Sequence, residues 1–579
     1  MHYPVKALIL LALFASPAAS AIAQISASTS ASSRFERPLS LGMSGIELSR
    51  LLTLLRTLRY FQHPAISGNS GTASWAETDR RRHTVAATST IHGTPPRARG
   101  STTNSAHGSF PVVRVFERTS TIRGMGINPP DNDWTAEQGG LTATRSDALK
   151  FAGYNSLRIF VDFDGLMDAQ QPSARVDLAD AVSEATQRIS HAVSDGYKVV
   201  VATSLHPSRR LAVMEVPSEE NSRFKTAWSA LASAVTRTLS PANVALEIMN
   251  EPPSEADISH AGYQSYAGSF ARSISAVIRA AAPHHTIAIG ASDLQWAGAL
   301  PNLNANDYDG NTIFTFHGYD PGEFSHQGQI AMCRHLDGLP WPVTDYVGGV
   351  IQAKADMAVK VNSDGSLNAS EKVALISANN TRLDFLFDGG GDKTYFTPHL
   401  DIVADWAATH GVDPARIVAT EFGVVSAFNW DGTPGTSIEA RAAYERDWRT
   451  GMEARGFGWI VYQAVGDLNH FRQSSITTQR DTLIVELTEA LGMNSPTPGD
   501  ITDLTASSTE STIIELRFTP VLDATSYEYR RDGGEAHALA ADKKVVGLQP
   551  STQYAMEVRG KNASTVGPWS NVLRATTSE

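Results

Sequence analysis

Two stretches of the 579-residue chain, VALEIMNEPP at 244–253 and RIVATEFG at 416–423, decide the fold. Each is an apolar, β-rich run that leads to a glutamate beside turn-forming residues, Glu251 in the first and Glu421 in the second. A (β/α)8 barrel presents its catalytic groups in this way, because its parallel strands all end at the same face. The two stretches therefore predict a barrel with two carboxyl groups at its C-terminal face.

Other runs of the same kind extend the pattern over residues 112–494, with helical segments between them. Eight strands that alternate with helices predict an α/β fold with a parallel sheet, closed into a (β/α)8 TIM barrel. An open doubly wound sheet is the alternative, but no Gly-rich phosphate-binding loop follows the first run. The predicted strands are 121–127, 157–161, 198–205, 244–249, 285–291, 312–317, 416–421 and 458–463. The long segment 318–415 lies between the sixth and seventh strands, so we expect it to shape a substrate cleft.

Two carboxyl groups at one face are what the hydrolysis of a bond between sugars requires. One carboxyl protonates the leaving oxygen, and the other meets the positively charged centre that develops on the sugar. An acid that is protonated before cleavage and ionised afterwards needs a raised pKa, and Glu251 is the candidate for this role. The sequence thus predicts a glycosidase.

The composition excludes several classes of partner. The 60 acidic residues outnumber the 48 basic ones and give a formal net charge of −12. This balance argues against nucleic acid and anionic membranes, and it favours a neutral polysaccharide over a polyanionic one. The sequence contains one cysteine, Cys333, so no disulfide can form within it, and a buried small apolar role is expected for this thiol.

The first 23 residues are typical of a secretory signal. Lys6 precedes the apolar run 7–14, and small residues at alternate positions within 19–23 offer cleavage sites. The apolar run is shorter than the roughly 20 residues that a membrane span requires, so a cleaved signal is preferred to an anchor. We therefore expect a secreted protein, extracellular or periplasmic, without membrane contact after cleavage. Residues 24–111, rich in Ser, Thr, Ala and Arg, are expected to form a disordered leader.

The end of the chain predicts a second domain. SPTPG at 495–499 marks a linker over 495–500, and polar and apolar residues then alternate through 501–579, as in a small antiparallel sandwich. LQPSTQY at 548–554 and GPWS at 567–570 resemble a fibronectin type III domain, with Phe518 in place of the early tryptophan of that family. The domain is expected to be a spacer or interaction module; a sugar platform at Trp569 is the alternative.

The barrel segment, over about 112–492, resembles glycoside hydrolase family 5, a family of retaining β-glycanases. The resemblance rests on NEP at 250–252, TEFG at 420–423, SLRIFV at 156–161, TSLHP at 203–207 and FHGYDPGEFSHQG at 316–328. It implies that Glu251 is the acid/base at the end of strand four and that Glu421 is the nucleophile at the end of strand seven.

The same motifs imply supporting residues. Asn250 is expected to hydrogen-bond the 2-hydroxyl of the sugar, and Arg158 is expected to keep Glu421 ionised. A core salt bridge between Arg158 and Glu247 is the alternative for that arginine.

Three further residues are implied around the substrate. His206 resembles the substrate-side histidine of the family, and His317 and Tyr319 are expected to hydrogen-bond the nucleophile and position it. The histidine pair could instead indicate a metal site, but no carboxylate at ligand spacing accompanies it in the sequence. No metal and no cofactor are therefore predicted.

Aromatic residues are candidates for stacking on sugar rings. The family usually has a tryptophan in strand eight, whereas GWIVYQ at 458–463 places Tyr462 there, with Trp459 three residues earlier. Trp134 and Trp296 are further candidates, each balanced between a substrate-binding role and a core role.

Together these features predict a secreted, metal-independent retaining β-glycosidase that acts as a monomer on a polysaccharide. A β-1,4-glucan is the expected substrate, because endoglucanase activity is widespread in the family that the chain resembles. A β-mannanase or another β-glycanase of the same family is the nearest alternative. A non-hydrolytic glycan-binding or adhesion protein is the remote alternative, and it would predict the loss of a catalytic group.

Overall fold

The computed structural model describes residues 122–127, 141–172, 174–258, 263–328, 333–426, 435–475, 478–495 and 497–579, with the backbone alone for 472–475 and 478–481. The predicted signal, the predicted leader and Trp134 lie outside these residues. Within them, no helix has the length and apolar character that a membrane crossing demands.

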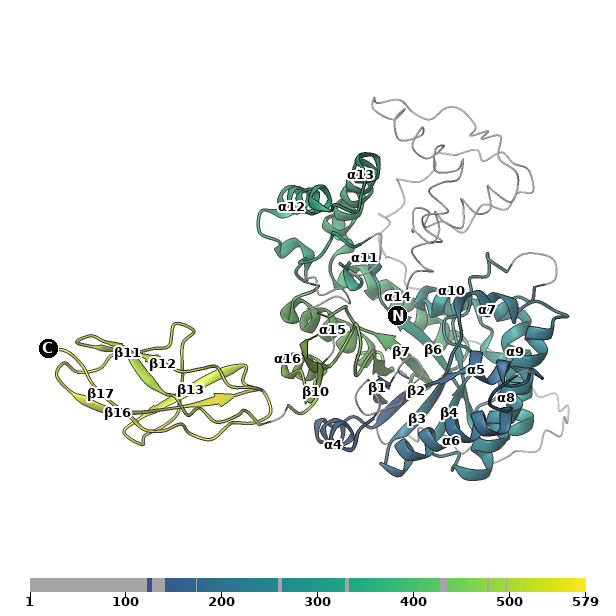
Figure 1. The fold of residues 1–579 in the computed structure, drawn as a ribbon, viewed down its shortest axis with the longest axis horizontal. Helices are drawn as coiled ribbons and strands as arrows, with labels where there is room; N and C mark the ends of the chain where they lie inside the picture. Colours follow the sequence, from purple (N-terminus) through teal and green to yellow (C-terminus); the bar gives the residue numbers. More distant parts are fainter. Residues whose placement is uncertain are drawn as a thin grey trace, which may run out of the picture. The chain divides into compact units, whose positions relative to one another are not determined.

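Eight parallel strands form a closed barrel, as predicted (Figure 1). Each strand pairs with its neighbours in the sequence, and β1 pairs with both β2 and β8 to close the ring. The strands are β1 Arg123–Ile127, β2 Ser156–Asp162, β3 Lys198–Ser204, β4 Val244–Glu247, β5 Thr286–Gly290, β6 Thr312–Gly318, β7 Ile417–Phe422 and β8 Gly458–Val461. They match the eight predicted runs to within a few residues at each end.

Helices surround the strands and cover their outer side, as Figure 1 shows for α6 and α8. The α-helices are α4 Ala143–Ala152, α5 Phe163–Asp168, α6 Leu178–Ser194, α7 Pro207–Ala212, α8 Glu219–Thr238, α9 Ala271–Ala281, α10 Ser292–Gln295, α11 Gly322–Ser325, α12 Gly349–Ser363, α13 Ala369–Phe385, α14 Lys393–Thr409, α15 Ile438–Glu453 and α16 Val485–Ala490. The short segment α10 is a left-handed turn rather than a true helix, since Asp293 and Leu294 have positive φ angles.

Helix α8 illustrates how the sequence specifies the outer layer. The Ser218 hydroxyl accepts a hydrogen bond from the Asn221 N–H, and two glutamates occupy the first turn, where they complement the helix dipole. Apolar residues then recur every three or four positions, which places them on one face. This face is fully buried and contains Phe224, Trp228, Leu231 and Val235.

The inside of the barrel is filled by side chains that alternate with outward-facing ones along each strand. The lower layer is apolar and consists of Ile122, Val200, Ala245, Ala288, Ile313, Val418 and Ile460. Two residues further along β4, β6 and β7, toward the C-terminal face, the inward positions become polar: Glu247, Thr315 and Thr420. The interior of the barrel therefore has an apolar lower layer and a polar upper layer. The candidate site is built on the polar upper layer.

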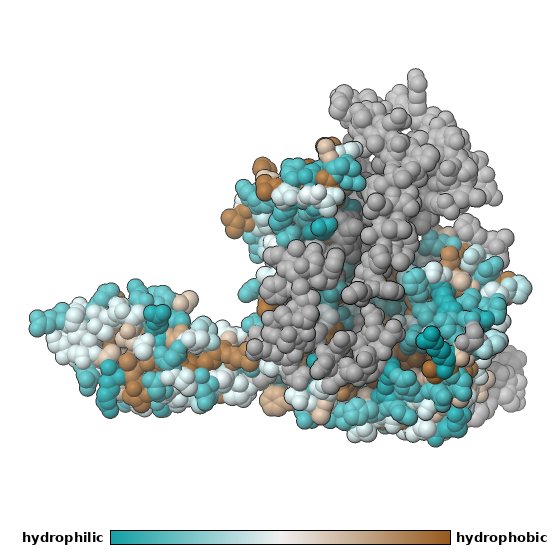
Figure 2. Space-filling view, viewed as in Figure 1, coloured by the Kyte–Doolittle hydropathy of each residue, from teal (hydrophilic) through white to brown (hydrophobic). Residues whose placement is uncertain are grey.

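The segment between β6 and β7 is largely helical and contains α11, α12, α13 and α14. Helices α12 and α13 lie side by side in Figure 1 and carry apolar patches on their surface in Figure 2. Cys333 lies in the same segment and is fully buried, and burial raises the pKa of its thiol to about 12. This agrees with the small apolar role predicted for it.

Short strands Phe471–Ser475 (β9) and Thr478–Leu483 (β10) form a hairpin, and the residues after α16 build a β-rich region. That region has a three-stranded sheet, β11-β12-β15, and a four-stranded sheet, β14-β13-β16-β17. Its strands are β11 Thr505–Thr509, β12 Ile513–Arg517, β13 Ser526–Arg531, β14 His537–Ala538, β15 Lys544–Val546, β16 Gln553–Lys561 and β17 Leu573–Thr576.

The β-rich region has its own hydrophobic core, in which Phe518 is buried. Trp569 lies outside that core, and the guanidinium groups of Arg530 and Arg559 lie 4.5 Å and 4.3 Å from its ring centroid. Cation–π contacts of this kind occupy the ring surface that a sugar would stack on, so they favour a structural role for Trp569.

Candidate active site

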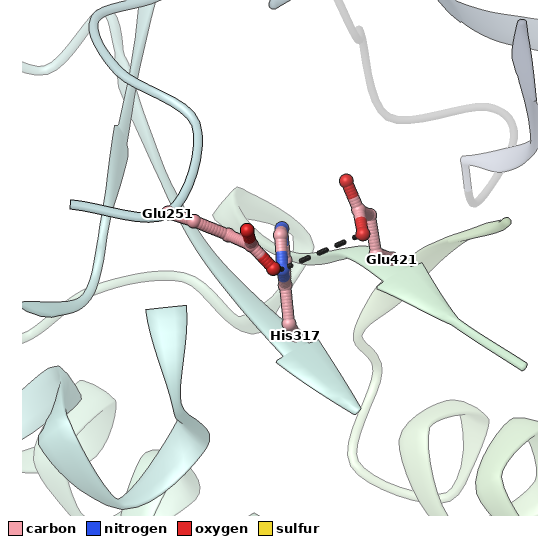
Figure 3. Close-up of side chains that lie close together, drawn as sticks. All are labelled: Glu251, His317 and Glu421. Carbon is pink, nitrogen blue, oxygen red and sulfur yellow. Dashed lines mark ion pairs between the residues drawn. The ribbon is translucent and has the colours of Figure 1, made fainter. Parts of the chain in front are cut away.

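The polar upper layer of the barrel brings side chains from β2, β4, β6 and β7 together. Glu251 follows β4, Glu421 lies in β7 and His317 lies in β6, and Figure 3 shows these three side chains converging. One oxygen of each glutamate and one ring nitrogen of the histidine lie within 4.8 Å of one another. The two glutamates that the sequence singled out therefore meet at one point, although 170 positions separate them.

Arg158 is the centre of a fully buried polar network. Its Nη1 donates to Glu421 Oε1 at 2.5 Å, its Nε donates to Glu247 Oε2 at 2.7 Å and its Nη2 donates to Asn250 Oδ1 at 2.7 Å. Burial alone would lower the pKa of Arg158, but the charges of Glu247 and Glu421 outweigh burial and raise it. The two contacts considered as alternatives for this arginine thus occur together.

Glu421 is held in place at both carboxylate oxygens. Oε1 accepts from Arg158, and Oε2 accepts from the Tyr319 hydroxyl at 2.7 Å, as predicted for this tyrosine. Burial, and then the charge of Glu421, raise the pKa of Tyr319 well above its usual value, so the phenol stays a donor. The β6–β7 register shifts between Phe316 and His317, where β7 contains an extra residue. Such a bulge re-aims side chains, and here both Thr420 and Glu421 contact the polar network.

His317 lies between the two glutamates (Figure 3). Its Nδ1 is 3.6 Å from Glu251 Oε1 and 3.7 Å from Glu421 Oε2, distances that allow an ion pair but exceed a hydrogen bond. The predicted hydrogen bond from His317 to the nucleophile is therefore wrong in this structure, because the ring lies between both carboxylates instead of against one. Neither ring nitrogen has a hydrogen-bond partner among the described residues.

Glu251 is the more exposed of the two glutamates, and its side chain is 28% exposed. Arg210 Nη1 donates to Glu251 Oε2 at 3.0 Å and to the Glu251 carbonyl at 3.1 Å. Burial raises the pKa of Glu251, but its interactions with His317 and Arg210 together outweigh burial and lower the pKa to about 2. The raised pKa predicted for this acid is therefore wrong for the unliganded site, because His317 and then Arg210 lie beside its carboxylate and favour the ionised form.

This contact predicts a pH effect. A general acid works only while protonated, so activity falls as pH rises through its pKa, and kcat/KM reports the free enzyme. Replacing Arg210 with glutamine removes one cause of the low pKa of Glu251. We expect the alkaline limb of the kcat/KM profile of Arg210→Gln to move up by at least about 1 pH unit.

Arg209→Gln is the matched control for that pH profile. Arg209 is the adjacent arginine, and it pairs with Asp164, Asp168 and Glu220 instead of Glu251. An unchanged alkaline limb in Arg210→Gln, or an equal shift in Arg209→Gln, would contradict the assignment.

The remaining residues predicted to contact substrate differ in their placement. His206 is exposed at the end of β3, where it caps α7 and its Nδ1 lies 2.7 Å from the Ser208 hydroxyl. Tyr462 is half-buried at the end of β8, edge-on to Phe160 with ring centroids 6.1 Å apart.

Trp296 is 37% exposed, and its indole N–H donates to Asp320 Oδ2 at 2.6 Å. Its backbone bridges to that of His317, at the C-terminal face of the barrel.

Trp459 does not lie at the site, and its prediction as a sugar-binding residue is wrong. Its side chain is fully buried against Tyr154 and Phe422, and its indole N–H donates to Glu453 at 3.2 Å. The reason is strand alternation: Ile460 belongs to the inner apolar layer, so its neighbour faces outward toward the helices.

The three converging side chains also raise the question of a metal site. Glu251, His317 and Glu421 are a group of the kind that can hold one, so the premise that no carboxylate joins a histidine here is wrong. His206 is not part of the group. The guanidinium of Arg158, 2.5 Å from Glu421, already supplies positive charge at this point and would repel a divalent cation. The donor set therefore fits a metal poorly.

Chelation should accordingly leave activity unchanged. We expect dialysis against EDTA to have no effect on polysaccharide hydrolysis, and subsequent addition of Zn²⁺, Mn²⁺ or Ca²⁺ to have none either. A loss with EDTA that one of these ions restores would contradict this expectation.

The barrel, with two carboxyl groups where its strands end, defines an enzyme of the TIM-barrel class, and comparison with known proteins gives its family. The family model described as "Cellulase (glycosyl hydrolase family 5)" matches residues 114–467. The chain therefore belongs to glycosyl hydrolase family 5 and is a glycoside hydrolase, as the sequence motifs predicted. No curated protein matches the chain.

Solved structures resemble this one at low sequence identity. The cellulose synthase subunit Z of Clostridioides difficile has 19% identity and a TM-score of 0.44, over 64% of this chain and 99% of that chain. Cel5A of Thermotoga maritima, solved with cellobiose, has 19% identity and a TM-score of 0.45, over 64% and 97%. Cel5A was also solved with mannotriose, and that structure has 19% identity and a TM-score of 0.43, over 64% and 97%.

Sequence reasoning missed two residues that contact Glu251. Arg210 lies in α7, five residues after the end of the predicted third strand, and nothing in its neighbourhood marks it. Gln295 follows β5 and is fully buried, with its amide oxygen accepting the Glu251 N–H at 2.8 Å. A polar residue shortly after a buried strand was the available signal for Gln295, but that signal is common in loops.

Proposed function

We propose that this glycoside hydrolase is a retaining β-glycanase that uses Glu421 as nucleophile and Glu251 as acid/base. The observation that carries the proposal is the short separation of the two carboxylates, whose nearest ligand oxygens lie within 4.8 Å. Retaining enzymes place their carboxyl groups about 5–5.5 Å apart, whereas inverting enzymes leave about 6.5–9.5 Å for a water molecule.

The reaction then has two steps at the same carbon. Glu421 attacks the anomeric carbon while Glu251 gives its proton to the leaving oxygen, and a glycosyl ester forms on Glu421. Glu251, now ionised, takes a proton from water, which attacks the same carbon and releases the sugar with its original configuration. Arg158 and Tyr319 hold Glu421 so that its free lone pair faces the sugar.

Three further residues complete the proposed site. The amide oxygen of Asn250 is taken by Arg158, so its N–H group is the one available to the 2-hydroxyl of the sugar. Tyr462 supplies a stacking surface at the end of β8, and His317, which lies between the two carboxylates, helps to position them. Glu251 must gain a proton before catalysis, so the leaving sugar is proposed to weaken its contacts with His317 and Arg210, which hold its pKa low.

The proposed substrate is a β-1,4-glucan, cut in endoglucanase fashion. The support is the cellulase description of the family; a β-mannan or another β-glycan is the second candidate. The test is reducing-sugar release by the full chain from carboxymethyl cellulose, mixed-linkage glucan, mannan, xylan and β-1,3-glucan. Release from carboxymethyl cellulose, alone or with mixed-linkage glucan, supports the proposal. Release from mannan alone would favour the second candidate.

A non-hydrolytic binding protein is the remaining alternative. It would lack one of the reacting groups, yet both glutamates, Asn250, Arg158 and His317 are present and close together. Tight binding to a polymer without any release would establish that alternative.

We also propose that the protein is secreted as a monomer, after cleavage of residues 1–23, and carries a fibronectin type III domain at 501–579. The signal-like sequence supports secretion, and the two sheets around one core support the domain. N-terminal sequencing of the protein from culture medium or periplasm tests the first point. A start at or before residue 6 would contradict it.

A further inference from the structure

The turn after β5 has an unusual backbone. Asp293, Leu294 and Gln295 have φ angles of 55°, 59° and 60°, so three successive residues with side chains are left-handed. This conformation costs free energy for any residue with a Cβ, and single residues adopt it far more often than runs do. Burial of Leu294 is not the reason for the turn, because that side chain is 55% exposed. A strained backbone of this kind is a reason to look for a function nearby.

The turn places the side chain of Gln295 inside the barrel, where it is fully buried. Its Nε2 donates to Glu247 Oε1 and to Thr315 Oγ1, each at 2.9 Å, and its Oε1 accepts the Glu251 N–H at 2.8 Å. A side chain at Gly290 would lie 2.6 Å from Gln295, so that position is left open for it. The glutamine side chain thus occupies the space that Gly290 leaves open, and both the N–H group and the oxygen of its amide have hydrogen-bond partners.

These bonds connect the two glutamates of the site through protein atoms. The connection runs from the Glu251 backbone to Gln295, from there to Glu247, then to Arg158 and finally to Glu421. Glu251 itself has a φ of 48° and is therefore strained too. Its N–H bond to Gln295 fixes the strained peptide and hence the direction of the carboxyl group.

We propose that Gln295 is a positioning residue, which fixes the position of the acid/base Glu251 relative to the nucleophile Glu421. The inference deepens the proposed function and rests on it. A neutral amide is required, because one end must donate to the Glu247 carboxylate while the other accepts from a peptide N–H. Apolar side chains can do neither, and a second carboxylate would face Glu247.

The test compares two leaving groups. Hydrolysis of a polysaccharide needs a proton from the acid, whereas a 2,4-dinitrophenyl glycoside of the same sugar departs without one. In Gln295→Met the acid is misplaced, so we expect kcat/KM on the polymer to fall about 10²-fold while the rate of glycosyl-enzyme formation from the aryl glycoside changes little. Equal losses on both substrates, or no loss on either, would overturn the proposal.

A second variant keeps the test usable if Gln295→Met does not fold. Gln295→Glu preserves the shape of the side chain, and its new carboxyl can donate to Glu247 only while protonated. We expect its polymer activity, relative to wild type, to fall as pH rises, with the aryl glycoside rate again spared. A pH-independent ratio would overturn the proposal.

The control is Leu294→Asn, in the same turn. Asparagine tolerates the left-handed conformation and the Leu294 side chain is exposed, so both rates should match wild type. Wild-type protein that hydrolyses neither substrate would instead refute the proposed function, and this inference with it. The two failures are therefore distinguishable.

Discussion

Replacing Glu421 with alanine is expected to reduce polysaccharide hydrolysis by about 10⁴- to 10⁶-fold, the order seen when a catalytic nucleophile is removed. The loss follows because the glycosyl ester cannot form without this carboxylate. Glu251→Ala should lose about 10²- to 10⁴-fold, the usual contribution of a general acid. Initial rates of reducing-sugar release measure both effects.

Azide separates the two roles, because a small anion can enter the space that each carboxylate leaves. With an activated β-glycoside, azide should give the α-glycosyl azide in Glu421→Ala, by direct attack opposite the leaving group. In Glu251→Ala it should give the β-glycosyl azide, by attack on the ester. The reverse assignment of products would exchange the roles of the two glutamates.

Replacing Arg158 with methionine should have the second largest effect. Arg158 is buried between Glu247 and Glu421, and its removal leaves two carboxylates without their shared counter-charge. Breaking a buried ion pair in this way costs about 3–5 kcal/mol, so the free energy of unfolding should fall by that amount. Activity should also fall, by about 10²- to 10³-fold, because the arginine orients Glu421 and Asn250. Urea denaturation and steady-state kinetics measure the two losses.

Arg158→Lys is the matched variant for this position. Lysine keeps the positive charge but has no planar fork, so it cannot donate to Glu247, Glu421 and Asn250 at once. Most of the unfolding free energy should return while activity stays low. Full activity in Arg158→Lys would show that charge alone suffices and would contradict the role of the three directed hydrogen bonds.

Sequence patterns predicted those parts of the site that depend on strand order. Each of the eight runs became a strand, and parallel strands end at one face, so Glu251 and Glu421 met as expected. The Arg158–Glu421 contact was implied by the family resemblance, and the contact with Glu247, its alternative, occurs beside it.

Other parts depend on details that strand patterns do not contain. The chemistry of Trp459 suggests a sugar-binding residue, but alternation with Ile460 turns its side chain outward. The low pKa of Glu251 depends on His317 and, after it, on Arg210, which lies in the short helix α7 and carries no sequence signal of its own. Gln295 is positioned by a left-handed turn that contains no glycine. No residue type in this stretch predicts such a turn.

Covalent trapping tests the central claim, that Glu421 is the nucleophile of a retaining enzyme. A 2,4-dinitrophenyl 2-deoxy-2-fluoro-β-glycoside of the sugar found in the cleaved polymer forms its ester quickly and loses it slowly. After proteolysis, mass spectrometry should find one added fluoro-sugar on the peptide that contains Glu421, and none in Glu421→Ala. A fluoro-sugar on any other residue, or turnover with inversion and no adduct, would contradict the account.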